Sequence, residues 1–343
     1  MARRLLTKQI ENTVMKYAPI LIPIMCRYNH FFRLIESLKV NTWAKYTDIY
    51  IGLDYPPSSK YEEGYKQICV YLNGDFSEFA SFNVIKHEKN IGSFANMTYL
   101  RDMAFKKYDR FIRTDDDCEF SPNFIEYMDK CLMEYETDSD VIAVSGYSYP
   151  IDWQVSRGAT ALKENFICPM WGTGFWRDKS CKIENEINGG CLKHAVDSVL
   201  RGGLYKKMLN TSKIEYINLC TPYLLGRNLA SFVTDISMRM YSVIYNKYII
   251  IPVKSKVRNW GFDGSGEYCA KSTHYSFKKQ EIDDSLDFLL DMDVICDMEN
   301  NRKLLNRFED IPLKERFKVL IKIFLYRMLG KYAFIYINNY AQI

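Results

Sequence analysis

Short apolar runs alternate with amphipathic stretches along the first half of the chain. Residues 20–25, with the sequence ILIPIM, are apolar enough for a buried strand, and Phe31, Leu34 and Leu38 then recur at helical spacing. Further strands are expected at residues 48–53, 82–85, 111–112, 141–144 and 248–252. Strands that alternate with helices are typical of a parallel sheet. The sequence therefore predicts an α/β fold with a mostly parallel central sheet flanked by helices.

The same pattern divides the chain into a large domain and an extension. Residues 1–266 are expected to form one domain, in which about 18–150 alternate regularly and about 151–266 are interrupted by glycines. Beyond them the chain becomes helical in pattern and rich in charge. Residues 267–343 are therefore predicted to form a C-terminal helical extension.

Composition and charge exclude several classes of protein. The 343 residues are 48% hydrophobic with a net charge of +4, which excludes a disordered chain and gives no electrostatic reason to expect nucleic-acid binding. No apolar run approaches the roughly 20 residues that span a bilayer. The ten cysteines form no CxxC pair and only four histidines accompany them, which disfavours a zinc cluster. We therefore expect a soluble, cytoplasmic protein with reduced thiols.

Polar residues follow the predicted strands where a parallel sheet binds ligands, at the carboxyl ends. This rule selects Arg27, Asp54, Asn90 and the run Asp115–Asp117. Three adjacent carboxylates repel one another unless a cation compensates them, and Mg²⁺ binds one or two carboxylates together with phosphate oxygens. In an extended segment the first and third carboxylates would face one side and the second the other. A solvated acidic turn is the alternative interpretation.

Six segments give the chain a resemblance to a known family. They are ILIPIMCRYN, IGLDYP, NIGSFANM, RTDDDCEFSPNFIEYM, the pair WGTGFW and TDISMR, and SKVRNWGFDGSG. In this order and spacing they resemble glycosyltransferases of the GT-A fold, over about residues 18–266. The chain is similar to the family 2 enzymes and, in motif spacing, to N-acetylglucosaminyltransferase I. The resemblance implies a Rossmann-like fold with a donor half at about 18–150 and an acceptor half at about 151–266.

The resemblance also implies roles for the residues at the strand ends. Asp117 would bind a Mn²⁺ or Mg²⁺ ion that bridges the diphosphate of a nucleotide sugar. Asp116 would then face the ribose hydroxyls and Asp115 the donor sugar. Asp54 would accept a hydrogen bond from the base, which favours a UDP-sugar because uracil offers an N3–H. Arg27 would lie near the nucleotide, where its fork of donors suits phosphate or a base carbonyl.

Further positions follow from the same motifs. Asn90 and Gly92 would form a loop that lets the backbone approach the donor. Trp171, Gly172 and Gly174 lie where the family places the floor of the acceptor cleft, since small residues admit a sugar ring and aromatic faces stack on it. The alternative for the tryptophan is a position in the core.

Three late features complete the predicted active site. Asp235 aligns with the family's catalytic carboxylate and would deprotonate the acceptor hydroxyl, as a single base suffices for an inverting transfer. The family usually has two adjacent acids at this point, whereas here Thr234 precedes Asp235. A helix-capping aspartate is the alternative. Residues 258–266, with three glycines, resemble a mobile lid over donor and metal. His274 could complete the metal shell.

The C-terminal extension contains a basic amphipathic segment. Its apolar residues at helical spacing are Leu313, Phe317, Leu320, Ile321, Phe324, Leu325 and Met328. Its charged residues are Lys314, Arg316, Lys318, Lys322, Arg327 and Lys331, against one acid, Glu315. Such a helix suits peripheral contact with an anionic membrane on its cytoplasmic face, which fits a lipid-linked acceptor. Alternatively it packs on the catalytic domain or on a second subunit of a homo-oligomer.

The sequence therefore predicts a metal-dependent, inverting hexosyl- or N-acetylhexosaminyltransferase of surface polysaccharide synthesis. It would use a nucleotide sugar as donor and a glycan or lipid-linked glycan as acceptor. One alternative is a non-catalytic, membrane-associated carbohydrate-binding protein on the same fold. Another is a sugar-nucleotide pyrophosphorylase, but that enzyme needs a glycine-rich basic loop after the first strand, where this chain has MCRYNH.

Overall fold

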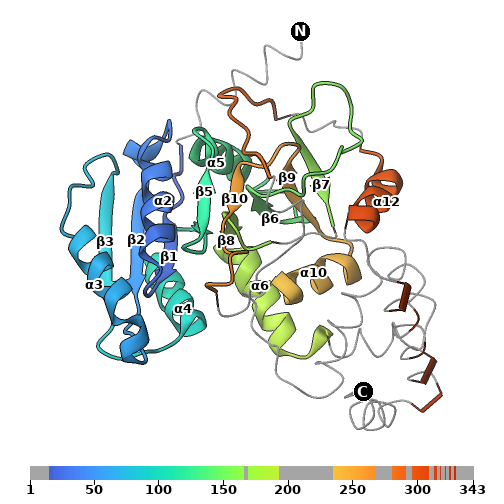
Figure 1. Ribbon diagram of the computed structural model, residues 1–343. Helices are drawn as coiled ribbons and strands as arrows, with labels where there is room; N and C mark the ends of the chain where they lie inside the picture. Colours follow the sequence, from blue (N-terminus) through green and yellow to red (C-terminus); the bar gives the residue numbers. More distant parts are fainter. Residues whose placement is uncertain are drawn as a thin grey trace.

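A single large sheet runs through the molecule (Figure 1). The computed structural model describes residues 15–165, 169–192, 235–266, 280–290 and 296–308, and eight residues between 313 and 329. The eight strands of the sheet are β1 Ile20–Ile24, β2 Asp48–Leu53, β3 Ser81–Lys86, β4 Arg110–Arg113, β6 Val141–Ser145, β7 Ala161–Glu164, β8 Thr173–Trp176 and β9 Tyr248–Pro252. Their order is β3-β2-β1-β4-β8-β6-β9-β7.

Strand direction confirms the predicted fold class. β1 pairs in parallel with β2 and β4, β2 with β3, and β6 with β9. β8 runs antiparallel to β4 and β6, and β7 runs antiparallel to β9. The protein is thus an α/β protein with a mostly parallel, Rossmann-like sheet. The short strands β7 and β8 are not evident in the sequence, because four residues carry too little alternation to stand out.

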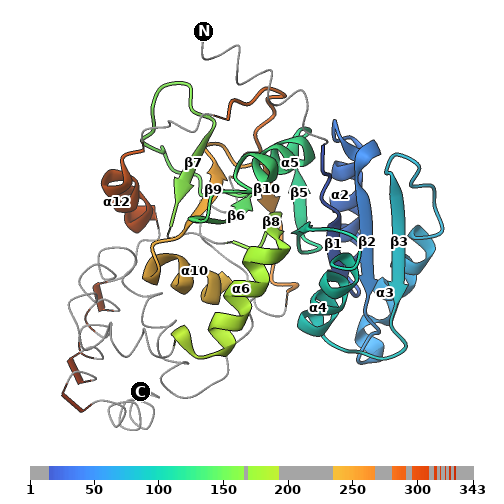
Figure 2. The same ribbon diagram turned by 180° about the vertical axis from the view of Figure 1, so that it is seen from behind.

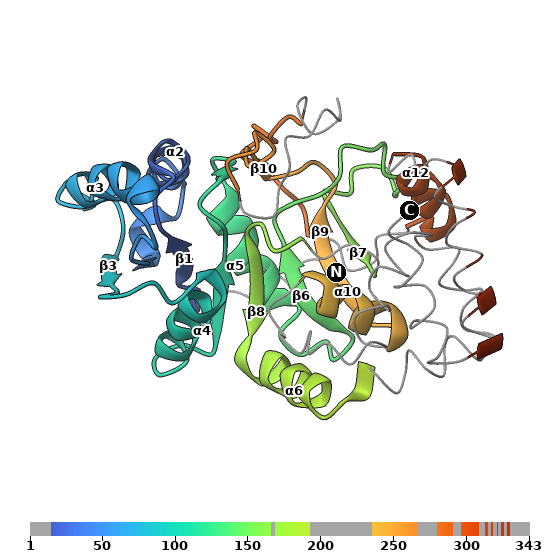
Figure 3. The same cartoon turned by 60° about the horizontal axis from the view of Figure 1, so that its bottom comes forward.

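Helices cover both faces of this sheet. They are α2 Tyr28–Lys39, α3 Glu62–Tyr71, α4 Ser93–Ala104, α5 Phe124–Glu134, α6 Arg177–Asn188, α10 Asp235–Ile244 and α12 Met298–Phe308. Two short 3₁₀ turns, Ala44–Tyr46 and Ser59–Tyr61, flank β2. Apolar residues of α2, α3 and α5 pack on one face, and those of α4, α6, α10 and α12 pack on the other. Figure 3 shows α2 and α3 on the opposite side of β1 and β3 from α4.

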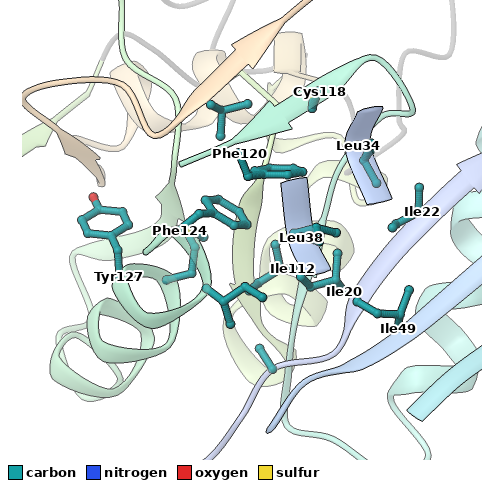
Figure 4. Packing of buried hydrophobic residues seen from close by; sticks show 14 of the residues in the cluster. Ile20, Ile22, Leu34, Leu38, Ile49, Ile112, Cys118, Phe120, Phe124 and Tyr127 are labelled. Atoms are coloured by element: carbon teal, nitrogen blue, oxygen red, sulfur yellow. The ribbon is translucent and has the colours of Figure 1, made fainter. Parts of the chain in front are cut away.

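β1 shows why a continuous apolar run forms a central strand. Successive side chains point to opposite faces, so Ile20 and Ile22 join the cluster around α2 whereas Leu21 joins the cluster around α4. All three are fully buried. Figure 4 shows Ile20 and Ile22 beside Leu34 and Leu38 of α2, which explains both the strand's apolar run and the helical spacing.

A second, two-stranded sheet joins distant parts of the sequence. β5 (Cys118–Phe120) pairs antiparallel with β10 (Val257–Asn259), with Cys118 opposite Asn259. The ladder therefore fixes the start of the glycine-containing loop at residues 260–266 beside the acidic run that precedes β5.

Described residues beyond 266, in the part predicted to form a C-terminal extension, pack on the preceding part of the chain. The ammonium of Lys256, 1% exposed, donates to Asn123 and lies 3.0 Å from the carboxylate of Asp283. Leu305 of α12 is fully buried in the core. Seen from both sides, α12 lies at the end of the molecule opposite to α3 (Figures 1 and 2). Among the helices described, none combines the length and the apolar character needed to cross a bilayer.

Asp129 on α5 is a buried carboxylate whose charge should make stability depend on pH. It is fully buried, its Oδ1 accepts the Ala18 backbone N–H at 2.9 Å, and its Oδ2 has no hydrogen-bond partner among the described residues. Burial raises the pKa of Asp129 to about 7, against the opposing effects of Ala18 and Arg110. The protonated form is therefore favoured in the folded state. The stability that the folded protein gains from a protonated Asp129 is fully present below about pH 4 and is lost as the pH rises towards 7.

We expect Asp129→Asn to remove this loss while keeping the acceptor for Ala18. Relative to the wild type, the variant should gain about 4 kcal/mol of unfolding free energy between pH 4 and pH 8, as expected for a carboxyl whose pKa folding raises from 3.8 to about 7. Urea unfolding at a series of pH values measures the difference. Asp140→Asn, at a carboxylate whose side chain is 61% exposed, is the control and should show no comparable trend. A constant difference between wild type and Asp129→Asn would contradict the prediction.

Candidate functional site

The predicted polar residues meet at one edge of the sheet. β1, β2, β3 and β4 are parallel neighbours, so the segments after them emerge on the same side. Arg27 follows β1 at the start of α2, and Asp54 follows β2 directly. Asn90 lies in the segment between β3 and α4, and Asp115–Asp117 lie between β4 and β5.

Arg27 lies between two carboxylates of the acidic run. Its Nε donates to Asp116 Oδ2 at 3.1 Å, and its Nη2 is in close contact with Asp116 Oδ1. Its Nη1 lies 3.0 Å from Asp117 Oδ2. Asp116 and Asp117 therefore face the same cation. The expected alternation of sides does not occur, because residues 116–117 form a turn rather than an extended strand. Asp115 instead accepts from Arg113 at 3.3 Å.

The electrostatics of this group follow from its burial. Burial raises the pKa of Asp116, and Arg27 opposes that effect. Burial, with the neighbouring charges of Asp115 and Asp116, raises the pKa of Asp117 to about 6 despite Arg27. Burial alone would lower the pKa of Arg27, but Asp116 and Asp117 outweigh it and raise that pKa. The turn therefore holds the partly buried guanidinium of Arg27 against Asp116 and Asp117, while Asp115 pairs with Arg113, so three carboxylates face two guanidinium groups and an excess of negative charge remains.

Residues 259–266, called the late loop from here on, contact the acidic turn formed by Asp115–Asp117. The Trp260 backbone N–H donates to the backbone oxygen of Asp117 at 2.8 Å, and Asn259 Nδ2 donates to Asp117 Oδ1 at 3.3 Å. Trp260 Nε1 donates to Glu119 at 2.7 Å. The Trp260 ring also contacts two guanidinium groups, of Arg258 at 3.7 Å and Arg33 at 4.4 Å from its centroid. The segment predicted as a lid thus contacts the acidic run.

Two residues of α2 that the sequence reasoning missed hold this loop. His30 Nε2 lies 3.0 Å from Asp263 Oδ2 and 3.3 Å from Ser265 Oγ. Burial by itself raises the pKa of Asp263, but hydrogen bonds from Ser265 and His30 outweigh it and lower that pKa to about 2. The other residue is Arg33. Spacing could have found both, because positions 27, 30 and 33 share one face of a helix that begins at the site.

Gly261 leaves room for the carboxylate of Asp117, which gives a prediction. A Cβ at position 261 would lie 2.1 Å from Asp117 Oδ2. We therefore expect Gly261→Ala to displace that carboxylate, with a loss of about 1–3 kcal/mol in unfolding free energy. The metal-dependent nucleotide binding that the resemblance implies should weaken about tenfold, because the Asp117 carboxylate would move away from its position in the acidic turn.

A double-mutant cycle tests the cause of this effect. Thermal unfolding and calorimetric nucleotide titration should be measured for Gly261→Ala alone and together with Asp117→Ala. In the Asp117→Ala background the alanine at position 261 meets no carboxylate, so its stability cost should disappear. An equal cost in both backgrounds would contradict the assigned contact.

Asp54 organises the neighbouring loop. Its Oδ1 accepts the backbone N–H groups of Tyr55 and Ile91, each at 2.9 Å. Its Oδ2 accepts the Gly92 N–H at 2.8 Å and Asn90 Nδ2 at 3.2 Å. Each carboxylate oxygen thus has two donors, which uses the ordinary acceptor capacity of the group. The predicted role of Asp54 towards a base remains a prediction, but its role in the loop is visible.

Asn90 and Gly92 complete this loop. Asn90 Nδ2 also donates to the backbone oxygen of Tyr55 at 2.7 Å and contacts the sulfur of Met25 at 3.7 Å. Gly92 precedes α4 with φ of 82°, a conformation that favours glycine, and a Cβ there would meet nothing within 4 Å. The loop therefore presents open backbone next to the end of β1.

The predicted acceptor residues lie against the core. Trp171 packs edge-on against Tyr147, with ring centroids 4.7 Å apart, and against Phe262 at 5.8 Å. Gly172 has φ of 64°, and a Cβ there would lie 2.9 Å from the Phe124 ring. Gly174 lies within β8 and packs on α5 side chains. These contacts explain the glycines by packing, and an acceptor role remains a prediction. The Trp171–Phe262 contact does connect this region to the late loop.

Two predicted residues are not brought to the acidic turn by any described contact. Asp235 is exposed and is the first residue of α10, a position that also suits an acid at a helix N-terminus. Its catalytic role remains a prediction. His274 lies outside the described residues.

The carboxylates of the acidic turn suit a hard divalent cation whose remaining ligands are phosphate oxygens and water. Among the described residues no group of three or more His, Cys, Asp and Glu side chains could hold a metal ion. Asp116 and Asp117 nevertheless offer adjacent carboxylates, with the partly buried guanidinium of Arg27 already between them. Mg²⁺ and Mn²⁺ accept such a sparse protein set when phosphate oxygens and water complete the shell. The residues present therefore fit a cation that binds together with a diphosphate.

Comparison with known proteins gives only distant matches in overall structure. No protein-family model matches the chain, and no curated protein matches it in sequence. A shorter form of S. aureus TarS in complex with UDP is 13% identical over 50% of this chain and 49% of its own, with a TM-score of 0.35. S. aureus TarS itself is 12% identical over 50% of this chain and 30% of its own, with a TM-score of 0.33.

A third solved structure is similar to the same extent. It is the mannosyltransferase PcManGT from Pyrobaculum calidifontis in complex with GDP-Man and Mn²⁺, 11% identical over 52% of each chain, with a TM-score of 0.32. Scores this low carry no argument about ligands or activity. The function has to be argued from the residues at the edge of the sheet.

Proposed function

We propose that the protein is a glycosyltransferase of the GT-A type that transfers a sugar from a nucleotide-sugar donor to a hydroxyl group of a glycan or lipid-linked glycan. The observation that supports this best is the acidic turn after β4. There Asp116 and Asp117 both contact Arg27, and Asn259 at the start of the late loop donates to Asp117. The excess negative charge of this turn suits a divalent cation, and a cation together with Arg27 suits a diphosphate.

Asp117 would hold the Mn²⁺ or Mg²⁺ ion. Asp116, for which the resemblance implies contact with the ribose hydroxyls, would share the ion, because both carboxylates lie against Arg27. When bound, such an ion neutralises charge on the departing diphosphate. Arg27 would orient phosphate oxygens, since its guanidinium is already held at the end of β1. The loop formed by Asn90 and Gly92 would receive the nucleoside side of the donor, with a UDP-sugar favoured. Asp115, more exposed than its neighbours, would approach the donor sugar.

Asp235 would act as the base for an inverting transfer. It would accept the proton of the acceptor hydroxyl as that oxygen attacks the anomeric carbon, and the diphosphate would leave from the opposite face. Trp171 would lie beside the acceptor. Because Trp171 contacts Phe262, a movement of the late loop would also move Trp171. We further propose surface polysaccharide synthesis on the cytoplasmic side of a membrane as the setting.

Thermal unfolding against a panel of nucleotides and nucleotide sugars tests this proposal. Each ligand should be measured with Mn²⁺, with Mg²⁺ and with EDTA, because a ligand that binds only the folded state stabilises it. Metal-dependent stabilisation by one UDP-sugar is the expected result and identifies the donor for a transfer assay. Stabilisation by GDP or dTDP compounds alone would keep the enzyme and overturn the uracil assignment of Asp54. No stabilisation by any ligand would favour a non-catalytic carbohydrate-binding protein.

A further inference from the structure

A row of large apolar side chains is exposed on the C-terminal segment. Leu313, Phe317, Ile321, Phe324 and Met328 are between 56% and 71% exposed. The eight residues of this segment that the structure describes are all helical. Successive members of the row are three or four positions apart, so they share one face of a helix. Isolated exposed apolar residues are ordinary, whereas a continuous row indicates an interaction surface.

The segment lies against the domain while this row faces outwards. Leu325 is partly buried against the core cluster that contains Leu305 of α12. In Figures 1, 2 and 3 the described residues of the segment, in dark red, lie on the α12 side of the molecule, away from α3. The exposed row is therefore attached to the folded domain and is presented at one end of it.

Basic residues stand next to the row in the sequence. Lys314, Lys318 and Lys322 each follow a member of the row directly, and Arg316 and Arg327 each precede one. On a helix, neighbours in sequence lie about 100° apart, so helical spacing of the sequence would place these charges on both sides of the apolar face. With Lys331 the segment carries six basic residues and one acid.

We propose that this row is the surface by which the protein lies on an anionic lipid bilayer. The apolar face would enter the boundary between headgroups and acyl chains, and the flanking basic residues would contact anionic headgroups. Association of the row with a second copy would instead bring two sets of six basic residues together, which is electrostatically unfavourable. The inference does not depend on the proposed transferase function, although an acceptor held in a membrane would explain both.

Vesicle flotation with the full chain tests the proposal. Vesicles of phosphatidylcholine alone should be compared with vesicles containing about one third phosphatidylglycerol, at low and at high salt. The test variant is the double substitution Phe317→Ser with Phe324→Ser. The control is Val40→Ser with Val70→Ser, two exposed apolar residues at the other end of the molecule. A charge variant, Lys318→Glu with Lys322→Glu, leaves the apolar row intact.

The wild type should bind the anionic vesicles and lose them at high salt. The Phe317/Phe324 variant should bind these vesicles at least about tenfold more weakly than the wild type. The charge variant should also bind more weakly, while the Val40/Val70 control binds as the wild type does. Thermal unfolding and nucleotide-induced stabilisation should not change in any of them. Equal binding of wild type and the Phe317/Phe324 variant would overturn the proposal, as would no binding by the wild type. A dimer that this variant dissociates, without vesicle binding, would show that a second copy covers the row.

Discussion

An Asp117→Ala variant should lose sugar transfer by on the order of a thousandfold or more, together with metal-dependent donor binding. The reason is that Asp117 unites the parts of the candidate site. Its carboxylate contacts Arg27 and Asn259, and its backbone oxygen accepts from Trp260. Removing it deletes one of two adjacent carboxylates available for a cation and one contact of the late loop.

The same variant should remain folded, which separates function from stability. Arg27 keeps its two contacts with Asp116, so its partly buried guanidinium is not left without a partner. Loss of one of three neighbouring carboxylates also relieves repulsion, and the pKa of Asp117 is raised to about 6 partly by that repulsion. We therefore expect the unfolding temperature to stay unchanged or rise slightly.

Transfer with radiolabelled donor, nucleotide titration with and without Mn²⁺, and thermal unfolding measure the three quantities. Asp117→Asn keeps the volume but not the charge and should behave as Asp117→Ala does. The control is Asp140→Ala, which should retain full activity. Wild-type transfer by Asp117→Ala would remove the central claim about the acidic turn.

Much of the fold and the edge that carries the site could be predicted because their signals are local. A strand buried on both faces is a short apolar run, as in β1, and a helix covering it shows period 3.6, as in α2. Once the strands are parallel, the residues after them must emerge together. That is why Arg27, Asp54, Asn90 and the acidic run were found as one group without any knowledge of their contacts.

The partners of these residues could not be predicted, since they come from distant parts of the chain. Asn259 reaches Asp117 across 142 positions, and His30 reaches Asp263 across 233. No periodicity within a window reports such pairs. The contact of Asp116 and Asp117 with the same arginine could not be predicted for a related reason: three like charges in a row do not indicate which cation lies between them.

Asp54 and Gly174 show that position and role are separate questions. Asp54 was expected at the site and is there, yet its oxygens are used by the loop that carries Asn90 and Gly92. Gly174 was expected to admit a sugar, which stays a prediction, and its missing side chain makes room for Leu132 and Met128 of α5. Packing demands and ligand demands select the same residue types, so the sequence alone cannot distinguish them.

An Asp235→Asn variant should bind the nucleotide sugar normally and transfer it about 10²–10⁴-fold more slowly. Asp235 is exposed at the start of α10. Met238 and Tyr241 anchor this helix in the core, so the backbone that carries the Asp235 carboxylate is held in place. The amide keeps the size of the side chain but cannot accept the acceptor's proton. The loss should therefore appear in kcat, with donor binding and donor KM unchanged.

A matched control distinguishes a base from an acid that only stabilises its helix. Asp178 is an exposed acid in the first turn of α6, and Asp178→Asn removes the same favourable interaction with a helix N-terminus, about 0.3–1 kcal/mol. Both variants should lose a similar, small amount of unfolding free energy, whereas only Asp235→Asn should lose turnover. If Asp235→Asn kept the wild-type kcat, the base would have to lie elsewhere, and Asp235 would be assigned to the stability of α10. Retention of kcat would leave the acidic turn as donor site intact, so the two predictions test separate halves of the mechanism.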